Sequence, residues 1–155
     1  MASWSEVEAE VPELVARARE FLDANQHKTL ATLRRDGSPR ISGTEVDFAD
    51  GDAWFGSMWK AVKALDLRRD PRFAIHSASP DPDEGWEGDA KFAGLVEEVE
   101  DPAVKEARGG GAGGRAYHLF RADVTELVVV SLTEARDKLV IESWRPGRGV
   151  RRVER

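Results

Sequence analysis

The sequence predicts a mainly β fold of the α+β class, with six or seven antiparallel strands and two or three helices. Asp-Gly turns at residues 36–37 and 50–51 separate three short runs of strand-forming residues. Long segments of β-forming residues also fill much of the second half, whereas the clearest helical spacing of apolar residues lies near the N-terminus. Such strands close into a barrel or a sandwich, to which the helices are additions.

The N-terminal segment, residues 1–25, is predicted to be helical. Ser3 and Glu6 have the spacing of a capping box, in which each side chain bonds the backbone N–H of the other residue. Apolar residues then recur at three- and four-residue steps as far as Leu22. Pro12 falls inside that pattern. Because proline is tolerated in the first turn of a helix, we expect the main helix to run from Pro12 to about Ala24.

Three strands are expected to follow as a meander. The first covers residues 28–33 and the third covers residues 53–57. Pro39 opens the second strand, where its missing backbone donor is tolerated. Because side chains alternate between the two faces of a strand, five residues of the second strand share one face: Arg40, Ser42, Thr44, Val46 and Phe48.

The remaining elements are shorter and more mixed. A helix over residues 60–69 is expected to end at Asp70, because that residue precedes a proline. Gly94, inside a strand predicted for residues 90–100, indicates a bulge or a close backbone approach. The glycine run at residues 109–114 is interpreted as a mobile loop, with a phosphate-cradling loop as the alternative. The other predictions are strands over 73–77, 117–130 and 138–144, a loop over 79–88 and a short helix over 103–108.

Composition narrows the class of protein. The chain has 155 residues, no cysteine and a formal net charge of −6. The length predicts a single domain over residues 1–155, and the lack of thiols excludes disulfides and thiolate metal sites. The negative charge argues against nucleic-acid binding, and the lack of an apolar span or a signal favours a cytoplasmic protein without membrane contact. The arginines of the last eleven residues are interpreted as a solvated basic tail: Arg145, Arg148, Arg151, Arg152 and Arg155.

Two groups of polar residues are candidates for holding an anionic ligand. Lys60 and Lys63 are three residues apart, so on a helix they point to the same side and would suit a phosphate. The same spacing fits a solvated helix equally well, and both interpretations stay open. Arg40, Ser42 and Thr44 form a row that would suit a phosphate or the edge of a polar ring, or else an ordinary exposed strand face.

The histidines and tryptophans give weaker indications. His27, His76 and His118 are far apart in sequence and show neither a metal-ligand spacing nor a catalytic series, so no metal site is predicted. His76 is interpreted as a hydrogen-bonded strand residue rather than a general acid or base. Trp59 and Trp86 fall in turns or loops, where they would line a flat ring or a subunit interface.

Three sequence motifs together resemble one known family. They are LATLRRDGSPRIS at residues 30–42, KALDLRRDPRFAIH at residues 63–76 and GDAKFAG at residues 88–94. The chain resembles the pyridoxamine 5′-phosphate oxidase-like family of FMN- and F420-binding split β-barrels, most clearly over roughly residues 26–101. The resemblance implies a six- to seven-stranded antiparallel split β-barrel with flanking helices. It also implies a homodimer with the cofactor in grooves between the protomers.

The resemblance implies FMN as the cofactor, with the deazaflavin F420 as the alternative, and it assigns positions in this sequence. Lys63 corresponds to the lysine that holds the cofactor phosphate. Ala61 stands where many relatives have a serine, and Lys60 would compensate for that lost hydroxyl. The other implied cofactor-binding residues lie on the ring-lining strand or border the ring: Arg40, Ser42, Gly43, Thr44, Ser57 and Met58.

The implied function is that of a flavin- or deazaflavin-dependent oxidoreductase, in which the cofactor carries hydride to or from a small molecule and no side chain acts as acid or base. Two alternatives stay open: a non-catalytic module that stores or senses a flavin or haem, and a cofactor-free dimer, which Ala61 favours. Oxidation of pyridoxamine phosphate itself is disfavoured. Neither the acidic loop nor the glycine run supplies the arginines expected to hold that substrate.

Overall fold

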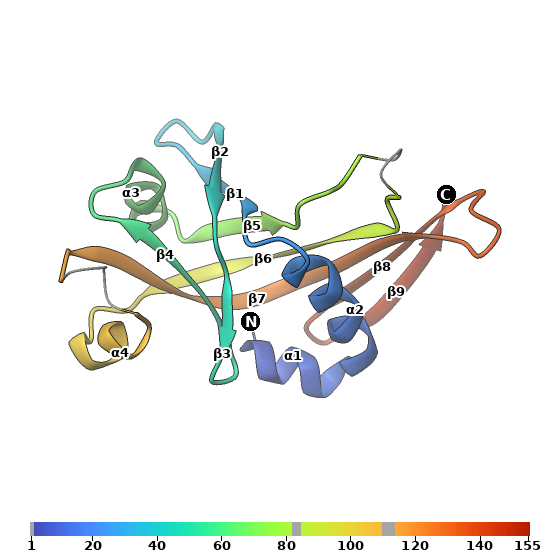
Figure 1. The fold of residues 1–155 in the computed structure, drawn as a ribbon, viewed down its shortest axis with the longest axis horizontal. Coiled ribbons are helices and arrows are strands. Elements are labelled where there is room, and N and C mark those ends of the chain that lie inside the picture. The colour runs from blue at the N-terminus through green and yellow to red at the C-terminus, as the bar shows by residue number, and fades with distance from the viewer. Residues whose placement is uncertain (1, 82–84, 110–113) are drawn as a thin grey trace.

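The computed structural model describes residues 2–81, 85–109 and 114–155, and over these ranges it confirms the α+β class (Figure 1). The described residues form nine antiparallel strands and four helices rather than six or seven strands and two or three helices. The inner part of the glycine run, residues 110–113, lies outside the described residues. In chain order the elements are α1 (Trp4–Glu10), α2 (Pro12–Asp23), β1 (Lys28–Leu33), β2 (Pro39–Thr44), β3 (Asp47–Ala49), β4 (Asp52–Met58), α3 (Val62–Arg69), β5 (Arg72–His76), β6 (Gly88–Glu98), α4 (Pro102–Ala107), β7 (Tyr117–Leu132), β8 (Leu139–Arg145) and β9 (Gly149–Glu154).

Strand β7 is the point at which the sheet divides. One of its edges pairs with β6, while the other edge pairs with β4 over residues 117–122 and with β8 over residues 127–132. The strands therefore follow the order β2-β1-β5-β6-β7-β4-β3, with β8 and β9 added beside the later half of β7. This division separates a curved part that carries α3 from an extended part that ends at the C-terminus (Figure 1).

The predicted irregularity at Gly94 is confirmed. The register between β6 and β7 shifts between Ala93 and Gly94, as expected for a β-bulge. A Cβ atom at Gly94 would lie 1.8 Å from the carbonyl oxygen of Asp123, so no other residue fits without movement of the backbone. The bulge bends the two longest strands together at the point where the sheet divides.

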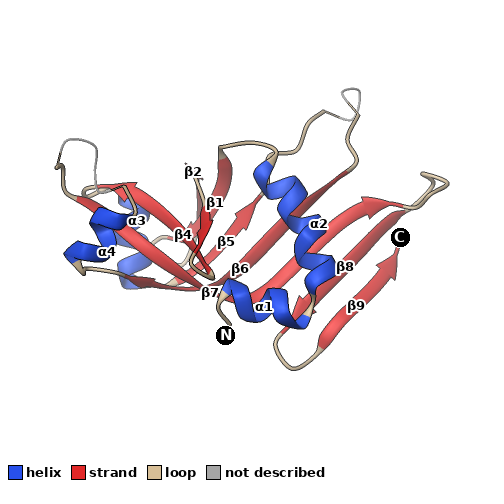
Figure 2. Ribbon diagram, turned by 60° about the horizontal axis from the view of Figure 1, so that its bottom comes forward, coloured by secondary structure: helices blue, strands red, loops and turns tan. Residues whose placement is uncertain are grey.

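The two N-terminal helices cover one face of the sheet (Figure 2). The capping box is present, with Ser3 and Glu6 bonding each other's backbone N–H, and Pro12 starts α2 as predicted. Beneath the helices, Trp4, Phe48 and Phe92 form a cluster of ring contacts that continues through Phe73 to other core aromatics. In the described part of the chain, no helix is both long and apolar enough to cross a membrane.

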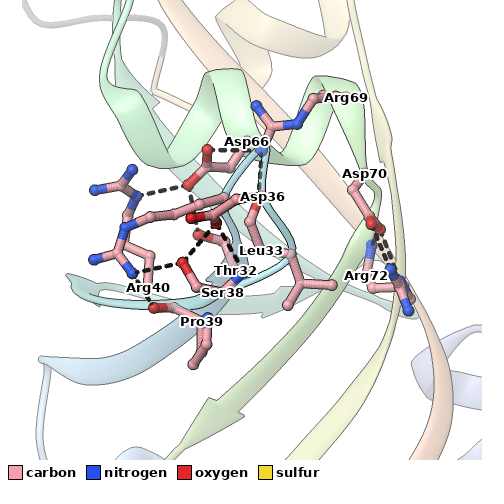
Figure 3. A network of polar contacts seen from close by, with 11 residues as sticks. Thr32, Leu33, Asp36, Ser38, Pro39, Arg40, Asp66, Arg69, Asp70 and Arg72 are labelled. Atoms are coloured by element: carbon pink, nitrogen blue, oxygen red, sulfur yellow. Dashed lines mark hydrogen bonds and ion pairs between the residues drawn. The ribbon is translucent and has the colours of Figure 1, made fainter.

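Helix α3 is fixed to the first hairpin by a buried carboxylate (Figure 3). Asp66 is only 2% exposed and accepts hydrogen bonds from Thr32 of β1, from Arg40 of β2 and from Arg69 one turn along its own helix. The Arg40 and Arg69 nitrogens lie 2.6 and 2.9 Å from its oxygens. Burial raises the pKa of Asp66, but the three hydrogen bonds outweigh this effect and hold the pKa below its ordinary value.

Three local predictions were wrong. The second predicted strand is two strands, because β2 ends at Thr44 and β3 begins at Asp47. The predicted helix over residues 60–69 begins only at Val62, since Lys60 has a φ of +58° and lies in a turn, so Lys60 and Lys63 do not share a helical face. The basic tail is not simply solvated chain. Residues 149–154 form β9, whose backbone pairs with β8.

We expect Asp66→Asn to lower the free energy of unfolding by about 3 kcal/mol, because two arginines lose a buried counter-charge. A lowered folded-state pKa means that Asp66 stabilises the fold above about pH 4 and that this contribution disappears as pH falls through the folded value. The free energy of unfolding, measured with urea between pH 7 and pH 3, should therefore fall less steeply with pH in the variant than in the wild type.

The matched control is Asp23→Asn, which removes the exposed Arg19–Asp23 pair of α2 and should cost well under about 1 kcal/mol. Equal losses in the two variants would show that the Asp66 contacts do not fix α3.

Candidate functional site

An open groove of about 970 Å³ lies between the end of β2, the end of β4 and the start of α3. Gly43 and Thr44 come from β2, Ser57 and Met58 from β4, and Lys63 from the first turn of α3. The groove brings these elements together because Asp66 fixes α3 to the hairpin on one side, while β4 is held in the sheet on the other.

Lys63 is the main positive group that reaches the groove from a helix. Its ammonium group is half-buried and donates a hydrogen bond of 2.5 Å to the carbonyl oxygen of Gly43. Burial lowers the pKa of Lys63, because the charged form loses solvation. Among the described residues, no carboxylate pairs with this ammonium group, so an anionic ligand would supply the missing counter-charge.

Ser57 presents a buried hydroxyl that is left without a partner. Its side chain lines the groove with 9% of the residue exposed, and its Oγ bonds to none of the described residues. A buried hydroxyl without a hydrogen bond is costly, and such groups in native proteins call for an explanation. A ligand that bonds Ser57 Oγ would remove this cost.

The turn between β4 and α3 forms an aromatic wall of the groove. Met58 and Trp59 line the groove and are 81% and 50% exposed, although both side chains are large and apolar. The Trp59 ring stacks on His118 of β7 with centroids 4.8 Å apart. The backbone N–H of Lys60 donates to Nε2 of the same imidazole at 3.1 Å. The turn is therefore fixed to the sheet through a buried histidine.

The stems of the glycine run also border the groove. Gly109 on one stem and Arg115 on the other line it, together with Tyr117. The hydroxyl of Tyr117 donates to the carbonyl oxygen of Lys105 at 2.7 Å. Arg108 pairs with Asp47 and Asp50 of the β3–β4 hairpin. Hydrogen bonds thus hold both stems against the fold at the edge of the groove.

The groove contains five of the eight residues proposed from the sequence for cofactor binding. Arg40, Ser42 and Lys60 do not line it, although Ser42 and Lys60 are adjacent in sequence to residues that do. Arg40 is paired with Asp66, and the Lys60 ammonium is on an exposed turn. The groove residues Gly43, Thr44, Ser57, Met58 and Lys63 were identified from the sequence, whereas His27, Glu45, Gly56, Arg115 and Tyr117 were not.

The histidines of the described residues differ in their surroundings. No three of their His, Asp or Glu side chains gather as a metal site. His76 is a hydrogen-bonded strand residue as predicted, with Nδ1 2.7 Å from the carbonyl oxygen of Ser77. His27 lies at the groove with Nδ1 3.7 Å from a carboxylate oxygen of Glu45.

Fold and groove together define a split-barrel protein with a ligand-sized groove beside a lysine-bearing helix. The chain belongs to the pyridoxamine 5′-phosphate oxidase family, whose sequence profile matches residues 14–131. No curated protein matches the sequence.

Solved structures share this fold. The heme binding protein from Mycobacterium smegmatis aligns with a TM-score of 0.60 at 16% identity, covering 92% of this chain and 88% of its own. An FMN binding protein related to pyridoxamine 5′-phosphate oxidase, from Nostoc punctiforme, aligns at 0.61 and 12% identity, covering 100% and 98%. An F420 reductase aligns at 0.55 and 20% identity, covering 70% and 94%. These similarities establish the split-barrel fold.

We expect Ser57→Ala to leave the melting temperature of the ligand-free protein unchanged or slightly higher. The substitution removes a buried hydroxyl that makes no hydrogen bond to any of the described residues. Scanning calorimetry of the purified protein measures this directly.

Ser77→Ala is the matched control. Ser77 is also buried, but its Oγ accepts the backbone N–H of Ala90 at 3.1 Å, so its loss should cost about 1–2 kcal/mol. Equal destabilisation by the two substitutions would show that Ser57 has a structural partner.

Proposed function

We propose that the protein is a flavin- or deazaflavin-dependent oxidoreductase that binds FMN, or alternatively F420, in the groove beside α3. The observation that carries this proposal is the pairing, on one groove, of an ammonium group without a carboxylate and a buried hydroxyl without a partner. Both groups would be satisfied by a ligand that carries a phosphate and further polar atoms.

The residues present fit such a cofactor. A volume of about 970 Å³ lies at the upper end of the range usual for cofactor sites. Lys63 would hold the phosphate, Ser57 would bond a polar edge, and Trp59 would offer its exposed surface to a flat ring. Gly43 leaves open space above its backbone, so a ring can approach that strand closely.

The proposed division of labour gives the redox chemistry to the cofactor, which when bound accepts or donates a hydride. The protein's own residues bind and orient it. Lys63 anchors one end, the turn with Met58 and Trp59 covers one side, and Ser57 sets the position of the ring between them. This role needs no general acid or base from the groove.

The first test titrates the protein against FMN and, in parallel, against F420, and follows quenching of each cofactor's fluorescence. We expect saturable binding of one cofactor at one site per chain. Lack of binding by both would contradict the proposal and favour a scaffold that holds another ligand or none.

We expect Lys63→Ala to weaken the affinity for the cofactor by about 10- to 100-fold, because a charge-assisted hydrogen bond to phosphate contributes about 1.5–3 kcal/mol. Lys138→Ala removes an equivalent charge from an exposed turn between β7 and β8 and should leave the affinity unchanged. The same titration measures both variants. Equal affinity in the wild type and Lys63→Ala would refute the phosphate assignment.

A homodimer is part of the proposal, because large apolar side chains are exposed at the groove and on the elements that form it. Five exposed large apolar side chains lie on β2, on the turn and on α3: Ile41, Met58, Trp59, Val62 and Leu65. Ile41 is 74% exposed in the middle of β2. Association of two copies through these elements would cover such side chains and add a second wall to each groove.

We expect Ile41→Asp to convert the dimer into a folded monomer with weaker cofactor binding, as measured by sedimentation velocity and the fluorescence titration. Val150→Asp introduces the same charge at an exposed apolar site on β9, rather than on β2, the turn or α3, and should remain dimeric. A wild-type protein that sediments as a monomer at micromolar concentration would exclude the shared groove.

The alternative function is a non-catalytic module that stores or senses a flavin or haem. The specific observation in its favour is His27, whose imidazole lies at the groove and is 80% exposed. A protein with this fold from Mycobacterium smegmatis is a heme binding protein. Haem titration followed by the Soret band, with His27→Ala as the variant, distinguishes this alternative from flavin binding.

A further inference from the structure

We propose that His118 is a positioning residue that holds the aromatic wall of the groove in its neutral form, and that protonation of its Nε2 releases this wall. The proposal concerns the turn of residues 58–61, which connects β4 to α3. The effect on a bound cofactor rests on the proposed function, whereas the effect on the turn does not.

The hydrogen bonds of His118 define a single tautomer. Its Nδ1 lies 2.6 Å from Oε1 of Glu98 on β6, and its Nε2 lies 3.1 Å from the backbone nitrogen of Lys60. A backbone N–H can only donate, so Nε2 must accept and carries no proton. The neutral imidazole therefore carries its proton on Nδ1 and donates it to Glu98.

The turn that this bond holds is strained. Lys60 has a φ of +58°, a left-handed conformation that residues with a side chain adopt at a cost. Such a conformation persists only where surrounding contacts fix it. Here the Nε2 bond fixes the backbone, and the Trp59 ring lies against the face of the same imidazole with an interplanar angle of 12°.

The position of the turn determines where the groove residues on either side of it lie. The backbone N–H of Ala61 donates to the carbonyl oxygen of Met58 at 3.0 Å, and α3 begins at the next residue. Met58 and Trp59 before this bond, and Lys63 after it, all line the groove. One imidazole nitrogen thus determines where the aromatic wall and the ammonium group stand relative to each other.

Protonation reverses the role of Nε2. Because Glu98 already accepts the Nδ1 proton, an added proton goes to Nε2, which then faces the N–H of Lys60 as a second donor. The contact becomes repulsive, and the strained turn loses the hydrogen bond that His118 accepted. His118 is 1% exposed, so no water from outside the fold can replace this bond without movement of the turn.

The charged groups nearest to the imidazole come from β6, α3, α4 and the segments that connect these elements. Glu98 of β6 bonds it directly, and Arg68 of α3 lies behind Glu98 with Nε 2.9 Å from Oε2. Glu100 follows on the same side and is paired with Lys105. The Lys60 ammonium is on the exposed turn, and the β4 residue opposite His118 is Ser57, which carries no charge.

The test measures the backbone amide of Lys60 in ¹⁵N-labelled protein by hydrogen exchange, at pH 8 and at pH 5. Protection factors remove the intrinsic pH dependence of exchange. We expect the protection of Lys60 to fall by about tenfold as His118 takes up a proton, since this corresponds to the loss of one hydrogen bond.

Two variants separate the two nitrogens. His118→Gln keeps an acceptor near the Nε2 position but cannot take up a proton, so Lys60 should stay protected at both pH values. His118→Asn keeps a donor for Glu98 but lacks the acceptor, so Lys60 should be unprotected at both. His76→Gln, on β5, should retain the wild-type response.

A wild-type pH response in His118→Gln, or full protection in His118→Asn, would overturn the proposal. If His118→Asn fails to fold, the wild-type and His118→Gln curves still decide it. Titration with FMN and F420 at the same pH values then tests the link to binding, with affinity lost at low pH in the wild type but retained in His118→Gln. Failure of both cofactors to bind at any pH would reject the proposed function and leave the amide result standing.

Discussion

The contact between Asp66 and the first hairpin is the constraint on which the groove depends. A single buried carboxylate bonds Thr32, Arg40 and Arg69, and so joins two strands and a helix that are distant in sequence. A buried carboxylate without partners costs far more free energy than an exposed one. The charge-assisted bonds to Asp66 are therefore kept, and they hold the three elements in one arrangement. The position of α3 relative to β2 is therefore defined, and with it the distance that the Lys63 ammonium must span.

The same constraint explains why Lys63 bonds Gly43. With α3 docked, the ammonium group reaches the end of β2 and finds a backbone carbonyl rather than a carboxylate. A carbonyl satisfies one donor but leaves the charge uncompensated, which agrees with the lowered pKa of Lys63. Arg40 in contrast has its counter-charge in Asp66. Two cations that look alike in the sequence thus differ in whether they are free to bind an anion.

This difference shows which parts of the site could be predicted from the sequence alone. Gly43, Ser57 and Lys63 were identifiable because they lie on or beside elements whose local patterns are clear, and the family resemblance aligned them. The partner of Arg40 was not identifiable, because Asp66 follows it by 26 residues and meets it only after α3 docks. His118 was missed for a similar reason: its position opposite Ser57 depends on the pairing of β4 with β7. The arginines of β9 were interpreted as a solvated tail because their charge indicates exposed side chains. The strand they belong to is held by its backbone pairing with β8, which the side-chain pattern does not indicate.

The hydrophobic core and the groove are made of different residues. The core cluster of buried apolar side chains includes residues of α1, α2 and α3 and of both parts of the sheet, and none of these residues lines the groove. The groove instead consists of a turn, two strand ends and the stems of the glycine run, where side chains can change without loss of the core. Proteins with this fold can therefore bind ligands as different as haem and FMN, as those from Mycobacterium smegmatis and Nostoc punctiforme do. The ligand that we propose therefore depends on Lys63, Ser57 and Trp59 rather than on the barrel.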